Sequence, residues 1–154
     1  MFIKERSNKK EYEVVIEPVD DSDYKAITKK RYFFNWKTEK ENDVFKLRMV
    51  GSKDILGLVS ILCVSKEERI KINLLAVSKE NRGKKKQYER ICGCLIAFVS
   101  REAVKLYGVN ACVSLIPKTK LKEHYITQYG MEDAGKSVYL AGIPIQTILN
   151  NYDL

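Results

Sequence analysis

The sequence contains little proline, little glycine and no long apolar run. Its 154 residues include three Pro and eight Gly, and 31% of them are charged, which is unlike the composition of a disordered or low-complexity chain. No apolar stretch approaches the roughly 20 residues that a membrane-spanning helix requires. The charged beginning lacks the apolar core of a signal peptide. We therefore expect one globular domain, residues 1–154, that stays in the cytoplasm and does not bind a membrane.

Cysteine and histidine are scarce as well. The four Cys form no C-x-x-C pair, and His124 is the one His. One His with cysteines scattered over separate elements does not make a zinc-binding set. In a reducing compartment the cysteines are thiols. The sequence therefore predicts no structural metal.

The net charge of +8 is unevenly distributed. Residues 1–43 hold ten basic and ten acidic side chains, so the whole excess lies in the remainder of the chain. Residues 79–90 alone hold six basic and two acidic side chains, which is half of the excess. Such a run is either a solvated loop or a surface that attracts an anion.

Apolar periodicity predicts a mixed α/β domain in the order strand, helix, three strands, basic loop, helix, strand, helix, strand. The three consecutive strands indicate an antiparallel meander, and a short helix is expected in the last ten residues. The predicted strands are residues 12–19, 43–51, 55–64, 70–77, 111–117 and 137–145.

Three longer helices are predicted from caps and spacing. Residues 20–23 supply cap candidates for a helix through Lys30, and Thr119 is expected to cap a helix that ends at Gly130. The clearest helix follows the basic run and ends at Gly108. Its apolar positions are Ile91, Leu95, Phe98, Val99, Ala103 and Leu106.

One aromatic cluster lies between the first predicted helix and the next strand. It contains Tyr32, Phe33, Phe34 and Trp36. Because aromatic side chains more often fill a core than form a ligand cage, we interpret the cluster as packing against the sheet.

The basic run lies between a predicted strand and the first turn of an amphipathic helix. Unpaired amides at a helix start and the positive end of its dipole attract phosphate. Gly93 lies in that turn, where a missing side chain lets the backbone approach a ligand. Neither a G-x-x-x-x-G-K-[ST] loop nor a G-x-G-x-x-G turn occurs. The pattern indicates a phosphate-bearing ligand but does not specify which.

The sequence resembles the GNAT superfamily of N-acetyltransferases from about residue 12 to about residue 140. The resemblance depends on the element order and on the segments KINLLAV, QYERICGCLI and SLIPKTKLKEHYITQYGM. It implies a mostly antiparallel central sheet flanked by helices. It also implies acetyl transfer from acetyl-CoA to a primary amine by direct attack in a ternary complex, with no metal.

In that family a Q/R-x-x-G-x-G/A motif directs backbone amides at the pyrophosphate of acetyl-CoA. Aligning Leu95 with the Leu that follows the motif places Gln87 on the first position. Arg90 and Cys92 then replace both glycines. This helix-based register meets the requirement that helix amides reach the anion.

Counting from the preceding strand gives a second register. It places Arg82 and Gly83 at the motif start, which implies a loop lengthened by about five residues with extra lysines for charge-assisted contacts. The pantetheine arm would pair with backbone groups at the end of the strand. The resemblance thus gives as cofactor-binding candidates Leu75, Ala76, Val77, Arg82, Gly83, Lys84, Lys85, Lys86, Gln87, Tyr88, Arg90, Ile91, Cys92 and Gly93.

Family members often use a Tyr to protonate the departing thiolate. Tyr125 is our catalytic candidate, although it lies five residues before Gly130, where four is usual. Tyr129 is a weaker candidate, and packing against the cofactor is the rival role for Tyr125.

No general base is assigned. Lys71 occupies the strand position where some members have Glu, and it cannot accept a proton while charged. Asn73 lies on the same face and could only orient a water. The lone His124 is interpreted as solvated, and Cys92 and Cys94 as small packing residues.

Two other functions compete with the enzyme. One is a GNAT relative that binds CoA or an acidic partner without catalysis, and the other is a basic nucleic-acid-binding module. Nucleic acid is otherwise expected only as a tRNA-borne amine substrate. The sequence specifies neither the acceptor amine nor the oligomeric state.

Overall fold

The computed structural model describes all 154 residues and divides them into two compact units. Unit 1 comprises Met1–Ser60 and Leu74–Leu95, and unit 2 comprises Ile61–Asn73 and Ile96–Leu154. Strands β4 (Gly57–Val64) and β5 (Arg69–Val77) run through both, as does helix α2 (Ile91–Tyr107). The nine strands follow the order β6-β1-β2-β3-β4-β5-β7-β9-β8.

Most neighbouring strands are antiparallel, and β5 pairs with β7 in parallel. This confirms the predicted fold class, a mostly antiparallel sheet with flanking helices. The three strands predicted as a meander are neighbours in the order β3-β4-β5. None of the four α-helices combines the length and apolar character needed to cross a membrane.

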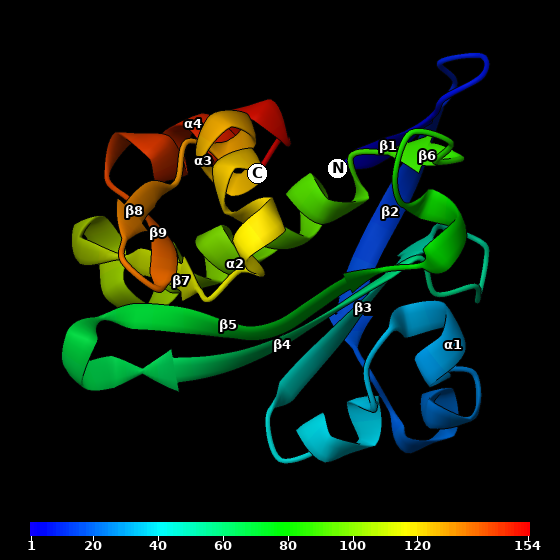
Figure 1. The fold of residues 1–154 in the computed structure, drawn as a ribbon, viewed down its shortest axis with the longest axis horizontal. Coiled ribbons are helices and arrows are strands. Elements are labelled where there is room, and N and C mark those ends of the chain that lie inside the picture. Colours follow the sequence, from blue (N-terminus) through cyan, green and yellow to red (C-terminus); the bar gives the residue numbers. More distant parts are fainter. The chain divides into compact units, whose positions relative to one another are not determined.

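Unit 1 contains the N-terminal strands and a short helix. Strand β1 lies between β2 and β6, and each pairing is antiparallel (Figure 1). The elements that lie wholly in this unit are β1 (Phe2–Glu5), β2 (Glu11–Pro18), α1 (Lys29–Tyr32), β3 (Asp43–Met49) and β6 (Tyr88–Glu89). Three 3₁₀ turns, at Asp21–Lys25, Trp36–Glu39 and Lys79–Asn81, connect them.

The core of unit 1 confirms the interpretation of the aromatic cluster. Tyr32 and Trp36 are buried, and Phe33 and Phe34 pack against them. The Tyr32 hydroxyl donates to the Ile55 carbonyl (2.6 Å). The buried members are Ile27, Tyr32, Trp36, Val44, Ile55, Leu58 and Ala76.

Unit 2 contains the C-terminal strands and the longer helices. Helices α2, α3 and α4 lie on the same side of β7 and β9 (Figure 1). The elements wholly in this unit are β7 (Cys112–Leu115), α3 (Lys122–Tyr129), β8 (Glu132–Ala134), β9 (Ser137–Ala141) and α4 (Ile143–Asn151). Further 3₁₀ turns are Ser65–Glu67, Gly108–Asn110 and Thr119–Leu121.

Apolar residues alternate along the unit 2 strands β5, β7 and β9. They face the helices, and polar residues lie on the opposite face, as strand alternation requires. The buried apolar residues of these three strands in unit 2 are Ile70, Ile72, Val113, Leu115, Val138 and Leu140, and the buried helix residues include Ile96, Val99, Ala103, Ile145 and Ile148.

Several predicted boundaries were wrong. The helix expected from residues 20–23 through Lys30 is two short elements, because Asp20 caps only a 3₁₀ turn and Thr28 caps α1 by accepting from the Arg31 amide. Thr119 lies inside a 3₁₀ turn and does not cap α3. Residues 143–145, expected to end a strand, begin α4, because Gly142 has a φ of 65° and breaks the strand.

Candidate functional site

The basic run forms a loop that is closed at its base. Asn81 is buried, and its side-chain amide donates to Ser78 Oγ (2.9 Å) while its carbonyl accepts from the Tyr88 amide (2.8 Å). The Gln87 amide donates to the Glu80 carbonyl (3.2 Å). These bonds join the two ends of the run, so the residues between them project from unit 1.

The cations of this run have different surroundings. Arg82 stacks on the Phe33 ring (4.1 Å to the centroid) and Arg90 on the Phe2 ring (4.2 Å). Lys84 and Lys85 are exposed and Lys86 is half-buried, and none of the three takes part in an ion pair. The three lysines are therefore available to an anion.

Part of the lengthened run is a strand rather than the loop we expected. Tyr88–Glu89 form β6, which pairs with β1, and the Arg6 amide donates to the Gln87 carbonyl (2.9 Å). Tyr88 packs edge-on against Tyr12 (5.8 Å), and burial raises the pKa of its hydroxyl. Residues 87–89 thus attach the cationic loop to the N-terminal hairpin.

Arg90 has a backbone φ of 82°. This is the left-handed region that glycine occupies readily and other residues rarely. Its carbonyl accepts from the Cys94 amide (2.9 Å), and its guanidinium Nε donates to the Phe2 carbonyl (3.1 Å). Arg90 therefore keeps a glycine-like turn at the start of α2.

The first turn of α2 is well packed. Ile91 is buried and faces Gly57 of β4, where an added Cβ would lie 2.9 Å from Ile91 Cγ2. Gly93 is also buried. Cys94 is fully buried, lies 3.4 Å from the Phe2 carbonyl, and has a pKa raised to about 12 by burial. At neutral pH Cys94 is therefore an unreactive thiol, as its interpretation as a packing residue predicted.

The pantetheine candidates form the end of β5. Ala76 is buried in the core of unit 1, while Leu75 and Val77 are half-buried. The following amide, that of Ser78, donates to the Leu56 carbonyl (2.9 Å). All fourteen cofactor-binding candidates, from Leu75 to Gly93, belong to unit 1.

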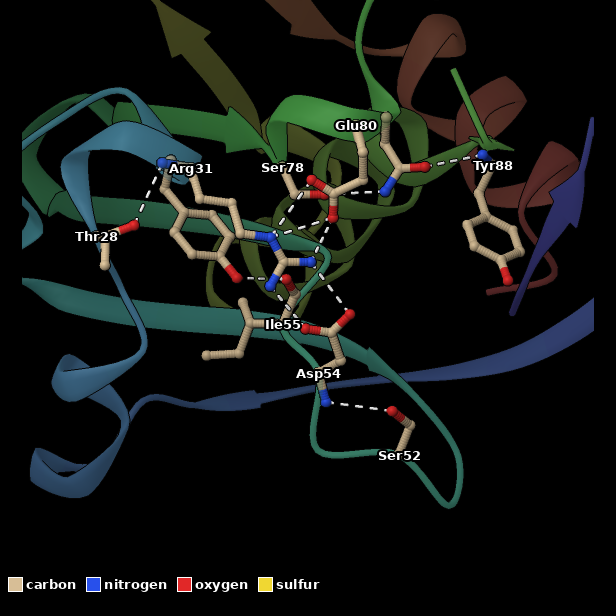
Figure 2. A network of polar contacts seen from close by, with 10 residues as sticks. Thr28, Arg31, Ser52, Asp54, Ile55, Ser78, Glu80 and Tyr88 are labelled. Carbon is tan, nitrogen blue, oxygen red and sulfur yellow. Dashed lines mark hydrogen bonds and ion pairs between the residues drawn. The ribbon is translucent and has the colours of Figure 1, made fainter. Parts of the chain in front are cut away.

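An ion-pair network beside the loop was missed by the sequence analysis. Figure 2 shows Arg31 of α1 between Asp54 and Glu80, with bonds of 2.7 Å from Nη1 to Asp54 and 3.1 Å from Nε to Glu80. Arg31 lowers the pKa of Glu80, and both carboxylates raise that of Arg31. The network holds the base of the cationic loop to α1. No local pattern could reveal it, since 23 and 49 residues separate the partners.

The catalytic candidate lies in unit 2. Tyr125 of α3 is 8% exposed, and its ring lies 6.0 Å from the His124 ring and 6.1 Å from the Tyr129 ring. His124 is exposed, as expected. Gly130, with a φ of 72°, ends the helix as predicted.

Solved structures with a similar fold are N-acetyltransferases. A mutant form of the spermidine/spermine N-acetyltransferase SpeG from Vibrio cholerae is 13% identical and aligns over 90% of this chain and 99% of its own (TM-score 0.61). The ribosomal-protein-S18-alanine N-acetyltransferase from Escherichia coli is 12% identical over 82% and 90% (TM-score 0.58). No protein-family model and no curated protein matches the sequence.

A third similar structure contains acetyl-CoA. A mutant AtaT toxin bound to the C-terminus of the antitoxin AtaR and to acetyl-CoA is 12% identical over 92% of this chain and 99% of its own (TM-score 0.58). At such low identity the likeness concerns the fold. The order of strands, the parallel pairing of β5 with β7 and the long helix after the cationic loop thus establish that this chain has the fold of the GNAT N-acetyltransferases.

Proposed function

We propose that residues 1–154 form one acetyltransferase domain that moves an acetyl group from acetyl-CoA to a primary amine. The observation that carries the proposal is the positive φ of Arg90 directly before α2. In the helix-based register Arg90 replaces the first motif glycine. A positive φ is the conformation that glycine adopts readily, so finding it at Arg90 supports the resemblance where it is most specific.

The residues of unit 1 suit the phosphates of CoA. Amides in the first turn of α2 attract an anion, and Lys84, Lys85 and Lys86 supply charge without an acidic partner of their own. Backbone groups of Leu75, Ala76 and Val77 would pair with the pantetheine arm, as the resemblance implies. The stacked Arg82 and Arg90 stabilise the loop.

The chemistry requires an attacking amine, a hydrogen-bond donor for the negative charge that develops on the carbonyl oxygen, and a proton for the leaving thiolate. The amine nitrogen forms a bond to the thioester carbon, and the carbon–sulfur bond breaks. We assign to Tyr125 the role of proton donor to the leaving thiolate. The amine loses its proton to solvent, since Lys71 occupies the position of the family's base.

The similar structures do not identify the acceptor. Their names specify spermidine or spermine in one case and the alanine of ribosomal protein S18 in another. The proposal therefore commits to a primary amine and to no particular compound. An aminoacyl-tRNA amine remains within this class.

Release of free CoA thiol tests the proposal. Acetyl-CoA is incubated with the chain and with polyamines, aminoglycosides, amino acids, peptides or aminoacyl-tRNA in turn. We expect release that depends on both the chain and one amine class. Release that never exceeds hydrolysis without the chain would exclude acetyl transfer.

One observation favours a second candidate, a CoA-binding protein without catalysis. Lys71 stands where some family members have a catalytic Glu, and it is half-buried on β5. Tight acetyl-CoA binding combined with no thiol release from any amine class would favour this second function.

A further inference from the structure

A hollow of about 390 Å³ lies on the face of the unit 2 sheet that the helices leave uncovered. Its floor follows from strand register. Lys71 of β5 lies opposite Ser114 of β7, which lies opposite Tyr139 of β9. Two residues earlier in each strand, Arg69 lies opposite Cys112. Side chains directly opposite one another on one face of a sheet are close neighbours, so two cations lie beside hydroxyl groups.

The cations of the hollow are differently constrained. Arg69 forms an ion pair with Glu67 through Nε and donates from Nη1 to Ser114 Oγ (2.8 Å). These bonds fix the guanidinium plane and leave Nη2 without a bond. Lys71 takes part in no ion pair and is half-buried. Two cations and one carboxylate give the lining a net charge of +1.

A second carboxylate limits the charge that the hollow accepts. The Tyr139 hydroxyl donates to Glu132 Oε2 (2.5 Å), and this bond raises the pKa of Tyr139. With Glu132 counted, the charges around the hollow sum to zero, so both carboxylates oppose a doubly charged phosphate, whereas a monoanion can be balanced by Lys71, which forms no ion pair. A carboxylate suits a fixed guanidinium and an adjacent ammonium. A polyamine would meet both cations.

We infer that this hollow binds a small molecule through its carboxylate, held by Arg69 and Lys71. The exposed Ile116 also lines the hollow and gives the ligand's carbon chain an apolar contact. The inferred ligand class is therefore an amino acid, a peptide or another small carboxylate.

The test compares ligands whose terminal group is a carboxylate, an amide or an amine. The probes are 4-aminobutyrate and glycylglycine, their amides, and 1,4-diaminobutane, each measured by saturation-transfer NMR on the full chain without acetyl-CoA. We expect the carboxylates to bind roughly tenfold more tightly than the amides, the effect of one charge-assisted contact. Lys71→Gln should remove this preference. Lys105→Gln, which removes an exposed charge from α2, should keep it.

Several results would overturn the inference. Equal binding of acids and amides, binding of none of the probes, or tighter binding of 1,4-diaminobutane would each do so. Displacement of the bound carboxylates by inorganic phosphate, at a concentration lower than that of the carboxylates, would also overturn it. Because binding is measured without acetyl-CoA, failure of the proposed function remains distinguishable.

Discussion

Arg90 combines a strained backbone with contacts that offset the strain. Its left-handed conformation costs on the order of 1 kcal/mol in a residue with a Cβ. The guanidinium stacks on Phe2 and donates to the Phe2 carbonyl. The residue therefore links the start of α2 to the N-terminal strand, a role that a glycine could not fill.

Two substitutions separate the backbone strain at Arg90 from the contacts of its side chain. Arg90→Gly removes the strain and the contacts together, whereas Arg90→Ala removes the contacts and keeps the strain. We expect the Gly variant to be more stable than the Ala variant by about 1 kcal/mol, measured by urea denaturation. An Ala variant at least as stable as the Gly variant would contradict the assigned conformation.

Tyr125 is the proposed proton donor for the leaving thiolate. Tyr125→Phe removes one hydroxyl and should lower kcat on the order of 10²–10⁴-fold while acetyl-CoA affinity is retained. Tyr129→Phe is the matched control on the same helix and should be nearly silent. Undiminished turnover of Tyr125→Phe, under conditions where chemistry limits the rate, would leave Tyr125 a packing residue.

At the scale of elements, the strands that the sequence did not predict are all short. Strand β2 and helix α2 have enough residues for their periodicity to be read. Strands β1, β6 and β8, with four, two and three residues, were missed. Such short segments are stabilised by pairing with a neighbouring strand. Because the neighbouring strand is distant in the sequence, the local sequence does not reveal it.

The contact between β4 and α2 depends on the absence of a side chain at Gly57. A Cβ there would lie 2.9 Å from Ile91 Cγ2 and 3.0 Å from Leu95 Cδ1. Because a β-branched side chain on a helix has little rotamer freedom, we expect Gly57→Ala to cost about 1–3 kcal/mol in urea denaturation.

A double-mutant cycle checks whether the close approach of Ile91 causes the loss of stability in Gly57→Ala. Ile91→Ala removes the nearest atom, so Gly57→Ala should cost clearly less in that background. Strict additivity of the two free-energy changes would show that the close approach is not responsible.

At the scale of the whole molecule, the sequence predicts the order of elements better than the site. The helix after the basic run and the strands on each side of it could be predicted because each one is a continuous segment with its own apolar periodicity. The glycine at the end of that helix is part of the same local signal. The candidate loop was located, yet its strand pairing and the engagement of Arg82 and Arg90 with Phe33 and Phe2 depend on contacts between distant segments. Likewise, Arg31 gave no local signal of its two partners.

Acid should weaken one of these distant contacts. Arg31 lowers the pKa of Glu80 below 4.5, so the pair stabilises the fold above that pH, and the contribution is lost as the pH falls through the lowered value. At pH 7, Glu80→Gln should lower the free energy of unfolding by roughly 1 kcal/mol or less, because the pair is partly exposed. The difference in Tm between the variant and the wild type should shrink between pH 5 and about pH 3. A pH-independent difference would contradict this assignment.

Calorimetric titration with acetyl-CoA tests the central claim most directly. We predict saturable binding to the wild-type chain. Replacing Lys84, Lys85 and Lys86 together by Gln should weaken it at least roughly tenfold, because charge-assisted contacts to phosphate are lost. The matched control replaces the exposed Lys37, Lys53 and Lys66 by Gln and should stay within about twofold, since screening limits distant charges. No binding at millimolar acetyl-CoA, or equal loss in both triple variants, would contradict the account.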